Sequence, residues 1–341
     1  MSTMYATPAQ TVSGTTIKKA LTFLKQVRPL QYMSNPAFST VCVSEGYWYT
    51  TNLYFQARVP APIEIPEGLY DLMAVLPVLT ASPAAIAVEE NGIRLNGLAI
   101  PRMGPVEDFP FLPVNLSESQ SLGPVPALWN TAIKFVAETD TRPVLKGILL
   151  SPTMHAVASN GSRLVRLQWT ELFDLPRPII CPAYALKTPA TLSVDTQQNI
   201  LHFTHAEGIM TVRAIDSQFP ENWAQLIPDP REAHWQGQCS GKTLREWIAP
   251  LIKLAGRKQQ LSLAMKTGEG QNPTVKTTPF FDIMEGSPEG EDILVNPSLF
   301  NFLGKETDTL SFTWTTYGIA APIMGKAPEI TVLILPLRHP I

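Results

Sequence analysis

The sequence is poor in charge. Only 16% of its 341 residues are Asp, Glu, Lys or Arg, the formal net charge is -3, and 45% of the residues are hydrophobic. This composition predicts folded cores and excludes a mainly disordered chain. The net charge argues against a protein held to nucleic acid by bulk positive charge, but it leaves room for a local basic surface.

Cysteines and long apolar runs are also scarce. The three cysteines are Cys42, Cys181 and Cys239, and no two of them have CxxC spacing. The polar N-terminal stretch lacks the apolar core of a secretory signal. No apolar run approaches the roughly 18 residues that a membrane-spanning helix needs. We therefore expect reduced, mostly buried thiols in a cytoplasmic protein.

No group of residues has the spacing of a catalytic or metal site. His202 and His205 lie three apart, so on a strand they face opposite sides and cannot share a metal ion. Ser162 lacks the G-x-S-x-G frame of a nucleophile elbow, and Asn160-Gly161 is typical of a hairpin turn. The segment "GQCSGKT" at Gly237–Thr243 has three residues between its glycines, whereas a phosphate-binding loop has four. We expect no metal, no cofactor and no catalytic residue, and keep a nucleotide-binding enzyme using Gly237–Thr243 as the weakest alternative.

Three features recur along the chain with a period of about 110 residues. The first is a proline-led segment at Pro66, Pro182 and Pro297, which predicts a short helix each time because proline is favoured in a helix's first turn. The second is a helix with one apolar face, followed by a strand. The helices are expected in "TIKKALTFLKQVRP" from Thr16, "PALWNTAIKFVAETDTRP" from Pro126 and "KTLREWIAPLIKLAGRK" from Lys242, with apolar faces Ile17, Leu21, Leu24; Leu128, Ile133, Val136; and Leu244, Ile248, Leu251. The third is "EDFPFLP" and "DSQFPENW", which place Phe109 and Phe219 in equivalent positions.

These agreeing periods predict an α+β protein of three repeated domains, each with two helices packed on antiparallel sheets. Pro-, Gly- or Ser-rich stretches mark the boundaries. The predicted division is a flexible tail at 1–14 and domains at 15–117, 118–232 and 233–341.

Basic residues recur beside the apolar face of each predicted helix or just after its end. On one helix this would indicate an ordinary solvated face. Its recurrence in three repeats predicts a positive lining that contacts a phosphate backbone without reading sequence. The candidate DNA-binding residues are Lys18, Lys25, Arg28, Lys134, Arg142, Arg245, Lys253, Arg257 and Lys258.

With these features in place, the chain resembles the bacterial DNA polymerase III beta subunit family, the DNA sliding clamps, from about Thr16 to Arg338. The resemblance is carried by "TRPVLKGILL", "ASNGSRLVRL" and "DSQFPENWAQLIP" in the middle repeat, by "EDFPFLP", and by "LILPLR" near the C-terminus. It implies a six-domain ring made by a head-to-tail homodimer around double-stranded DNA, and no enzymatic activity. The implied function is a processivity factor that tethers a polymerase, a clamp loader and other partners through short peptide motifs. A clamp-like adaptor that no longer encircles DNA is the alternative.

The resemblance also implies a partner-peptide pocket between the second and third domains. Its residues would be Leu145, Ser159, Gly161, Ser162, Arg163, Leu164, Leu333, Leu335, Pro336, Leu337 and Arg338. The apolar stretch "ITVLIL" near the C-terminus is expected to be the last strand of the third domain's sheet, bordering this pocket. For ring closure, the segments Gly92–Met103 and Pro273–Asp282 are predicted to meet across the dimer interface.

Overall fold

A computed structural model gives the structure of the chain. It describes residues 10–27, 36–77, 79, 83–126, 128–138, 142–161, 163–169, 174–227 and 235–240, single positions at 242, 246 and 249, and the strands between 262 and 334. The chain divides into two compact units, Met1–Val125 with Leu186–Ala214, and Pro126–Ala185 with Ile215–Ile341. The middle of the chain therefore contributes strands to both units, and the three-domain division stays a prediction.

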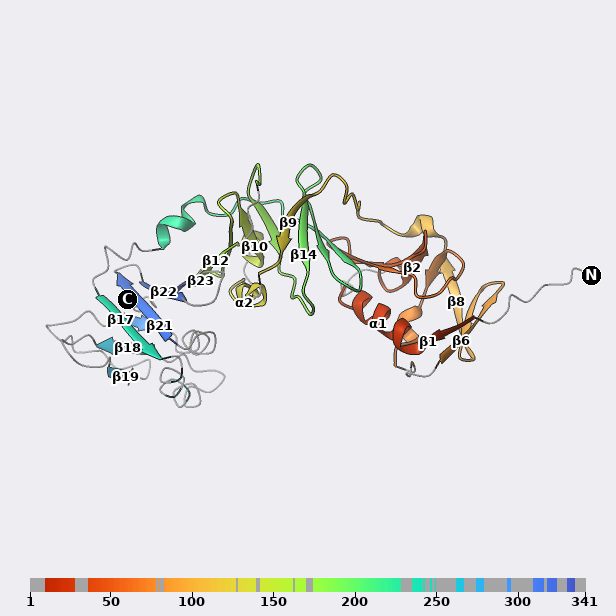
Figure 1. Ribbon diagram of the computed structural model, residues 1–341, viewed down its shortest axis with the longest axis horizontal. Coiled ribbons are helices and arrows are strands. Elements are labelled where there is room, and N and C mark those ends of the chain that lie inside the picture. Colours follow the sequence, from red (N-terminus) through yellow and green to blue (C-terminus); the bar gives the residue numbers. More distant parts are fainter. Residues whose placement is uncertain are drawn as a thin grey trace, which may run out of the picture. The chain divides into compact units, whose positions relative to one another are not determined.

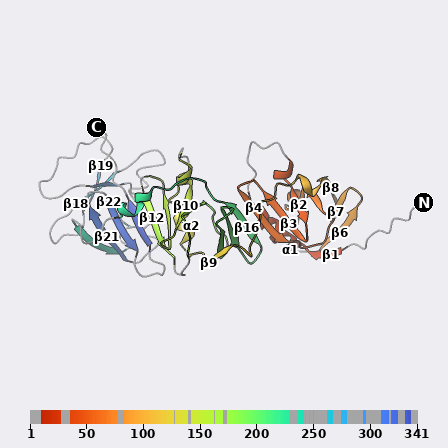
Figure 2. The same cartoon turned by 90° about the horizontal axis from the view of Figure 1, so that it is seen from above.

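The first unit is built on one antiparallel sheet of 12 strands (Figures 1 and 2). In sheet order these are β1 (Gln10–Ser13), β6 (Pro83–Glu89), β7 (Gly92–Leu95), β8 (Leu98–Gly104), β5 (Gly68–Tyr70), β2 (Val41–Ser44), β3 (Tyr47–Thr51), β4 (Phe55–Pro60), β16 (Ile209–Arg213), β15 (Ile200–Thr204), β14 (Thr191–Asp195) and β9 (Gln120–Pro124). Its helical segments are α1 (Gly14–Leu24) and the 3-10 turns η1 (Pro36–Phe38), η2 (Leu72–Val75) and η3 (Val106–Asp108). The pairing of β4 with β16 joins the first repeat to strands of the middle one.

The second unit contains a sheet of eight strands and one of three. The larger sheet is β13 (Ile179–Pro182), β10 (Gly147–Ser151), β11 (His155–Ser159), β12 (Arg163–Gln168), β23 (Ile330–Ile334), β22 (Gly318–Ile323), β21 (Thr309–Thr315) and β17 (Trp235–Ser240). The smaller is β19 (Thr274–Thr278), β18 (Ser262–Lys266) and β20 (Ile293–Val295). The helical segments with described bounds are α2 (Trp129–Ile133), η4 (Pro143–Lys146) and η5 (Glu221–Leu226), and the single described positions Lys242, Glu246 and Ala249 are also helical. The strand β23, formed by the apolar stretch near the C-terminus, lies between β12 and β22 (Figure 1), which confirms the expected last strand.

Helix α1 packs as its sequence pattern predicts. Ile17, Leu21 and Leu24 are fully buried, and the helix lies against β4. The hydroxyl of Thr50 on β3 donates a hydrogen bond of 3.0 Å to the backbone oxygen of Leu24, which satisfies one of the free carbonyl groups at the end of the helix. No described helix is long and apolar enough to span a membrane.

The predicted apolar face of the second helix is wrong. Helix α2 is only five residues long, and its buried residues are Trp129, Thr131 and Ala132, followed by Phe135 just after it. Leu128 and Ile133 are half-buried. The Trp129 indole donates 2.9 Å to the Tyr184 backbone oxygen, so the large aromatic side chain fixes which face is buried.

Two of the proline-led helices are also corrected. After Pro66 the chain forms strand β5 and then the 3-10 turn η2, because Leu69 and Tyr70 pair with neighbouring strands. Pro182 ends strand β13, and an irregular segment follows it. The third such segment, at Pro297, and most of the helix predicted from Lys242 lie outside the described residues. The α+β class itself is confirmed.

Candidate functional site

The hairpin between β11 and β12 holds the central residues of the predicted peptide pocket. Asn160 accepts a hydrogen bond of 3.1 Å from the Arg163 amide through its side-chain oxygen. The Ser159 hydroxyl donates 2.9 Å to the Arg163 carbonyl and accepts 3.1 Å from the Gly161 amide. Gly161 has φ +88°, a conformation that residues with a Cβ rarely adopt, so the predicted Asn-Gly turn is confirmed.

The sheet brings this hairpin beside the apolar strand near the C-terminus. Strands β12 and β23 are antiparallel, with Arg163 opposite Ile334 and Leu164 opposite Leu333. Two segments about 170 residues apart, which the family resemblance assigned to one pocket, are therefore direct neighbours. Ser162 and the remaining pocket candidates, Leu335, Pro336, Leu337 and Arg338, lie outside the described residues.

An apolar cluster carries the described wall of this site. Leu145, Leu149, Val157, Leu164, Ile180, Ala137 and Phe219 are buried together. Val144, Ile215, Trp223 and Ile227 pack against them and remain partly exposed. This mixture of a buried apolar floor and half-exposed apolar side chains is what an extended peptide's apolar anchor requires.

Arg163 joins the hairpin to the end of α2. Its guanidinium donates a hydrogen bond to the backbone oxygen of Lys134 and lies 5.0 Å from the centre of the Phe135 ring. Burial lowers the pKa of Arg163, and the Glu138 carboxylate acts in the opposite direction. The buried Nε atom has no hydrogen-bond partner. Part of this side chain is thus occupied in holding the site together, and its predicted contact with a peptide stays a prediction.

Arg142 lies against the same hairpin. A Cβ added to Gly161 would stand 2.9 Å from an Arg142 Nη atom, so the guanidinium packs directly over the glycine. The sequence grouped Arg142 with the DNA-binding residues, and that role stays a prediction. Its position also makes it a candidate for the peptide site.

The described DNA-binding candidates are well exposed. Lys18 lies on the outer face of α1, while Lys25 and Lys134 are the C-cap residues of α1 and α2. A lysine at a helix C-terminus also interacts favourably with the helix dipole, which is a sufficient structural reason for the last two. The basic lining therefore stays a prediction. Arg28, Arg245, Lys253, Arg257 and Lys258 lie outside the described residues.

The first repeat contains the same hairpin with different side chains. Between β3 and β4, Asn52 accepts 2.8 Å from the Phe55 amide, as Asn160 does from Arg163. Phe109 is buried in its cluster as Phe219 is in the other, so the predicted repeat is confirmed at these positions. The position of Leu164 is taken by Gln56. The buried side-chain amide of Gln56 donates a hydrogen bond of 3.2 Å to the Leu112 carbonyl and accepts one of 2.7 Å from the Leu112 backbone N–H. The Gln56 side chain is therefore bonded to the chain's own segment at Leu112, in a repeat whose apolar cluster contains Tyr49, Leu69 and Phe109.

The phosphate-loop interpretation of Gly237–Thr243 is wrong for its first half. Gly237–Ser240 belong to strand β17 and pair with β21, with Gly237 opposite Phe312. An extended strand cannot wrap successive amides around a phosphate group. The Lys242 ammonium is exposed and 4.0 Å from the Glu246 carboxylate, whereas Gly241 and Thr243 lie outside the described residues.

His202, His205, Cys42 and Cys181 are all buried in the fold. Among the described residues, no group of three or more His, Cys, Asp or Glu side chains is arranged to hold a metal ion. His202 is fully buried with Nδ1 3.1 Å from the Thr211 hydroxyl, and His205 contacts Thr188 and the Phe23 ring. Burial raises the pKa of the thiols of Cys42 and Cys181, so these thiols are poor nucleophiles.

The segments predicted for ring closure include strand edges that pair with no other strand in the described part of the chain. On β8, Leu98–Pro101 pair with β7, whereas pairing with β5 begins only at Arg102. Leu98 and Met103 are exposed apolar side chains on this strand. In the other segment, β19 is an edge strand of its sheet. Both are suited to pairing with another chain.

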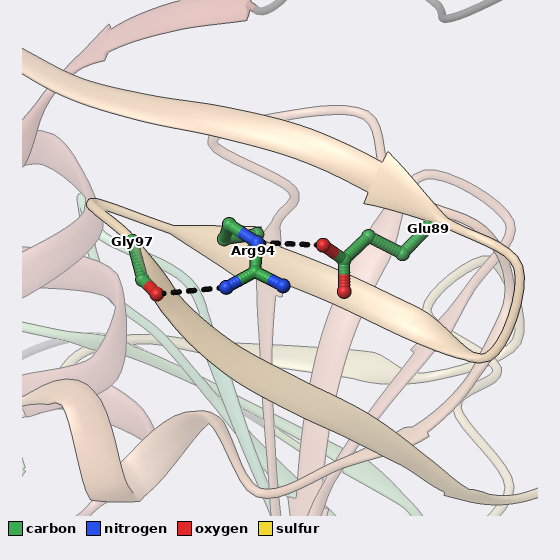
Figure 3. A network of polar contacts seen from close by, with 3 residues as sticks. All are labelled: Glu89, Arg94 and Gly97. Carbon is green, nitrogen blue, oxygen red and sulfur yellow. Dashed lines mark hydrogen bonds and ion pairs between the residues drawn. The ribbon is translucent and has the colours of Figure 1, made fainter.

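Arg94 on β7 contacts Glu89 and Gly97, which lie near the two turns that flank this strand (Figure 3). Its Nε atom lies 2.6 Å from a Glu89 carboxylate oxygen, and an Nη atom donates 3.0 Å to the Gly97 carbonyl. The ion pair is exposed, so it contributes little to global stability, and its effect is to fix the two turns that flank β7.

No family model and no curated protein matches the sequence. Solved structures match over almost the whole chain. The DNA polymerase III beta subunit from Thermotoga maritima has a TM-score of 0.71 at 15% identity, covering 97% of this chain and 99% of that one. The corresponding subunit from Pseudomonas aeruginosa has 0.72 at 17%, covering 97% and 100%. The beta sliding clamp from C. crescentus has 0.74 at 14%, covering 97% and 99%.

The chain therefore has the fold of the DNA sliding clamps. The resemblance inferred from the sequence is confirmed at the level of the fold, with the low identities of a divergent member.

The sequence interpretation missed Arg142 at the hairpin, and Phe219, Trp223 and Ile227 over the apolar cluster. The second group had a usable signal, because Phe219 was already aligned with Phe109 in the repeat. Arg142 had no such signal, since its contact depends on where the hairpin lies in three dimensions.

Proposed function

We propose that this protein is a DNA sliding clamp: a non-enzymatic processivity factor that encircles duplex DNA and tethers a replicative polymerase and other partners in DNA replication. The observation that carries this proposal is the match of the fold over 96–97% of the chain to sliding clamps. The register of β12 with β23 supports it further, because Leu164 lies opposite Leu333, and the resemblance assigned both to one pocket.

The ring would consist of two chains in a head-to-tail homodimer. The free edge of β8 and the edge strand β19 are the surfaces that we assign to closure. The expected solution mass is near twice 37.5 kDa, and a purely monomeric species at micromolar concentration contradicts this assignment.

Partners would bind in the pocket beside Leu164 and the end of β23. One structurally similar clamp, from Bartonella birtlesii, is bound to griselimycin, so a protein of this fold can hold a ligand. In this chain the apolar cluster around Leu164 offers such a surface, whereas at the equivalent first-repeat position the Gln56 side chain is hydrogen-bonded to Leu112.

DNA binding should be weak, independent of sequence and sensitive to salt. Encirclement links protein and DNA topologically, so loose contacts to phosphates suffice. Replacing Lys18, Lys25 and Lys134 with Ser should lower the slope of log affinity against log salt by about 0.9 for each phosphate that a lysine no longer neutralises. The measurement is a salt titration with labelled duplex by fluorescence anisotropy.

The matched control removes the same charge from other exposed positions. A variant with Lys146, Lys187 and Arg213 changed to Ser should retain the wild-type slope. Equal slopes for all three proteins would place the DNA on another surface.

A further inference from the structure

A basic position lies immediately next to the proposed peptide pocket. Side chains alternate along a strand, so Arg166 on β12 shares the face of Leu164. The register confirms this, because Leu164 is opposite Ser159 and Arg166 is opposite Val157, a member of the buried apolar cluster. Arg166 is half-buried and is thus the next side chain along the wall that carries the pocket.

The His155 imidazole interacts with the charge of Arg166, and the Trp223 indole lies beside that imidazole. His155 occupies the same face of β11, two residues from Val157. Its ring centre is 6.1 Å from that of Trp223, and its Nδ1 is 3.1 Å from the Thr153 hydroxyl. Burial, and then the charge of Arg166, lower the pKa of His155, so the imidazole is neutral near pH 7 and Arg166 provides the positive charge.

We propose that Arg166, flanked by His155 and Trp223, is a second recognition position of the pocket and selects an acidic side chain in the bound peptide. This inference rests on the proposed function, since it assumes that a peptide binds beside Leu164. Two residues of an extended strand advance about 6.6–6.8 Å, both on β12 and in an extended ligand. The acidic residue is therefore expected two positions from the peptide's apolar anchor.

The chemistry of the position favours a carboxylate. An arginine presents a planar fork of donors that matches the two oxygens of Asp or Glu. In a half-buried place such a pair is less screened than at an exposed surface. The Trp223 ring supplies apolar contact for the methylene groups of the same side chain.

The test is a titration of three short fluorescein-labelled peptides by anisotropy. All carry the same Leu-Phe anchor, and they have Glu two residues before it, Glu two residues after it, or Gln at both places. One of the Glu peptides should bind about tenfold more tightly than the Gln peptide, the size expected for one charge-assisted hydrogen bond. The preferred peptide also gives the direction of the bound chain.

The preference should disappear in Arg166→Gln and remain in Arg166→Lys. In Arg166→Glu it should reverse, so that a peptide with Lys in place of Glu binds best. Arg213→Gln, which removes an exposed arginine elsewhere, should behave as wild type. Affinity for the Gln peptide monitors the folding of the pocket, because it should change little in any of these variants.

The outcomes separate this inference from the proposed function. If wild type binds none of the peptides, the proposed pocket fails. If it binds all three equally, or if Arg166→Gln keeps the preference, the pocket stands and the acidic recognition position is overturned.

Discussion

Deleting Leu335–Ile341 should abolish the binding of clamp-binding peptides derived from polymerases. The deletion starts directly after Ile334, the last residue of β23 that pairs with β12, so the ladder on both sides of β23 is kept. It removes the part of the terminus that we assign to the pocket, Leu335 to Arg338. Fluorescence anisotropy with a labelled peptide measures the loss, and the single substitution Leu335→Ala should weaken binding by about 1–3 kcal/mol, the scale of one buried apolar side chain.

The matched control is a deletion of only His339–Ile341, which follows the pocket residues. This shorter deletion should bind peptide as wild type does. Both truncated proteins should keep the dimeric mass, which shows that the fold and the closure of the ring are intact. If the longer truncation binds peptide with unchanged affinity, the segment after β23 is not part of the pocket and the assignment is wrong.

Acid should destabilise the first unit through His202. Burial lowers the pKa of this fully buried imidazole to about 4, against an ordinary value near 6.5. Between these two pH values His202 is therefore protonated in the unfolded chain and neutral in the folded one. The free energy of unfolding should fall by about 3 kcal/mol as the pH decreases from 7 to 4, at about 1.4 kcal/mol for each pH unit in this window. Stability from this group is complete above the ordinary value and does not change further below the lowered one.

The measurement is urea unfolding at a series of pH values, with His202→Asn as the test variant. Asparagine places an amide near the position of Nδ1, so it can keep the contact with Thr211 but cannot titrate. Its stability should depend less steeply on pH than that of wild type. Thr211→Val is the control, because it removes the hydroxyl partner and retains the imidazole: it should be less stable at pH 7 and keep the steep dependence. Parallel pH profiles for wild type and His202→Asn would show that another group causes the acid sensitivity.

Much of the local structure followed from local sequence patterns. The apolar spacing of Ile17, Leu21 and Leu24 predicted the buried face of α1. The Asn160-Gly161 turn was predicted because the positive φ of Gly161 depends on residue type alone. These features depend on neighbours in the chain, which a sequence displays directly.

Features that depend on distant contacts could not be read in the same way. The buried face of α2 is set by Trp129, whose indole donates a hydrogen bond to the backbone oxygen of Tyr184. Tyr184 lies 55 residues further along the chain. The burial of Gln56 is possible only because Leu112 returns to pair with its amide, and nothing near Gln56 in the sequence indicates this.

The family resemblance predicted which segments form the pocket, but it did not predict the contacts that their side chains make. The strand near the C-terminus was placed beside Leu164 correctly. The contact of Arg163 with the Lys134 carbonyl, and of Arg142 with Gly161, arises from the packing of α2 and η4 on the hairpin. Such contacts leave no periodic signal, since each involves one long side chain reaching across elements.

The central claim is that the protein encircles DNA, and its most direct test is retention on DNA with and without ends. Rings re-formed from dissociated chains in the presence of a closed circular plasmid are separated from free protein by gel filtration at high salt, where ionic contacts are weak. The protein should stay with the circle and should be lost when one restriction cut makes the plasmid linear. Equal retention before and after the cut would mean ordinary binding to the phosphate backbone, and absence from the circle would mean an adaptor with the clamp fold that does not encircle DNA; either result contradicts the proposed function.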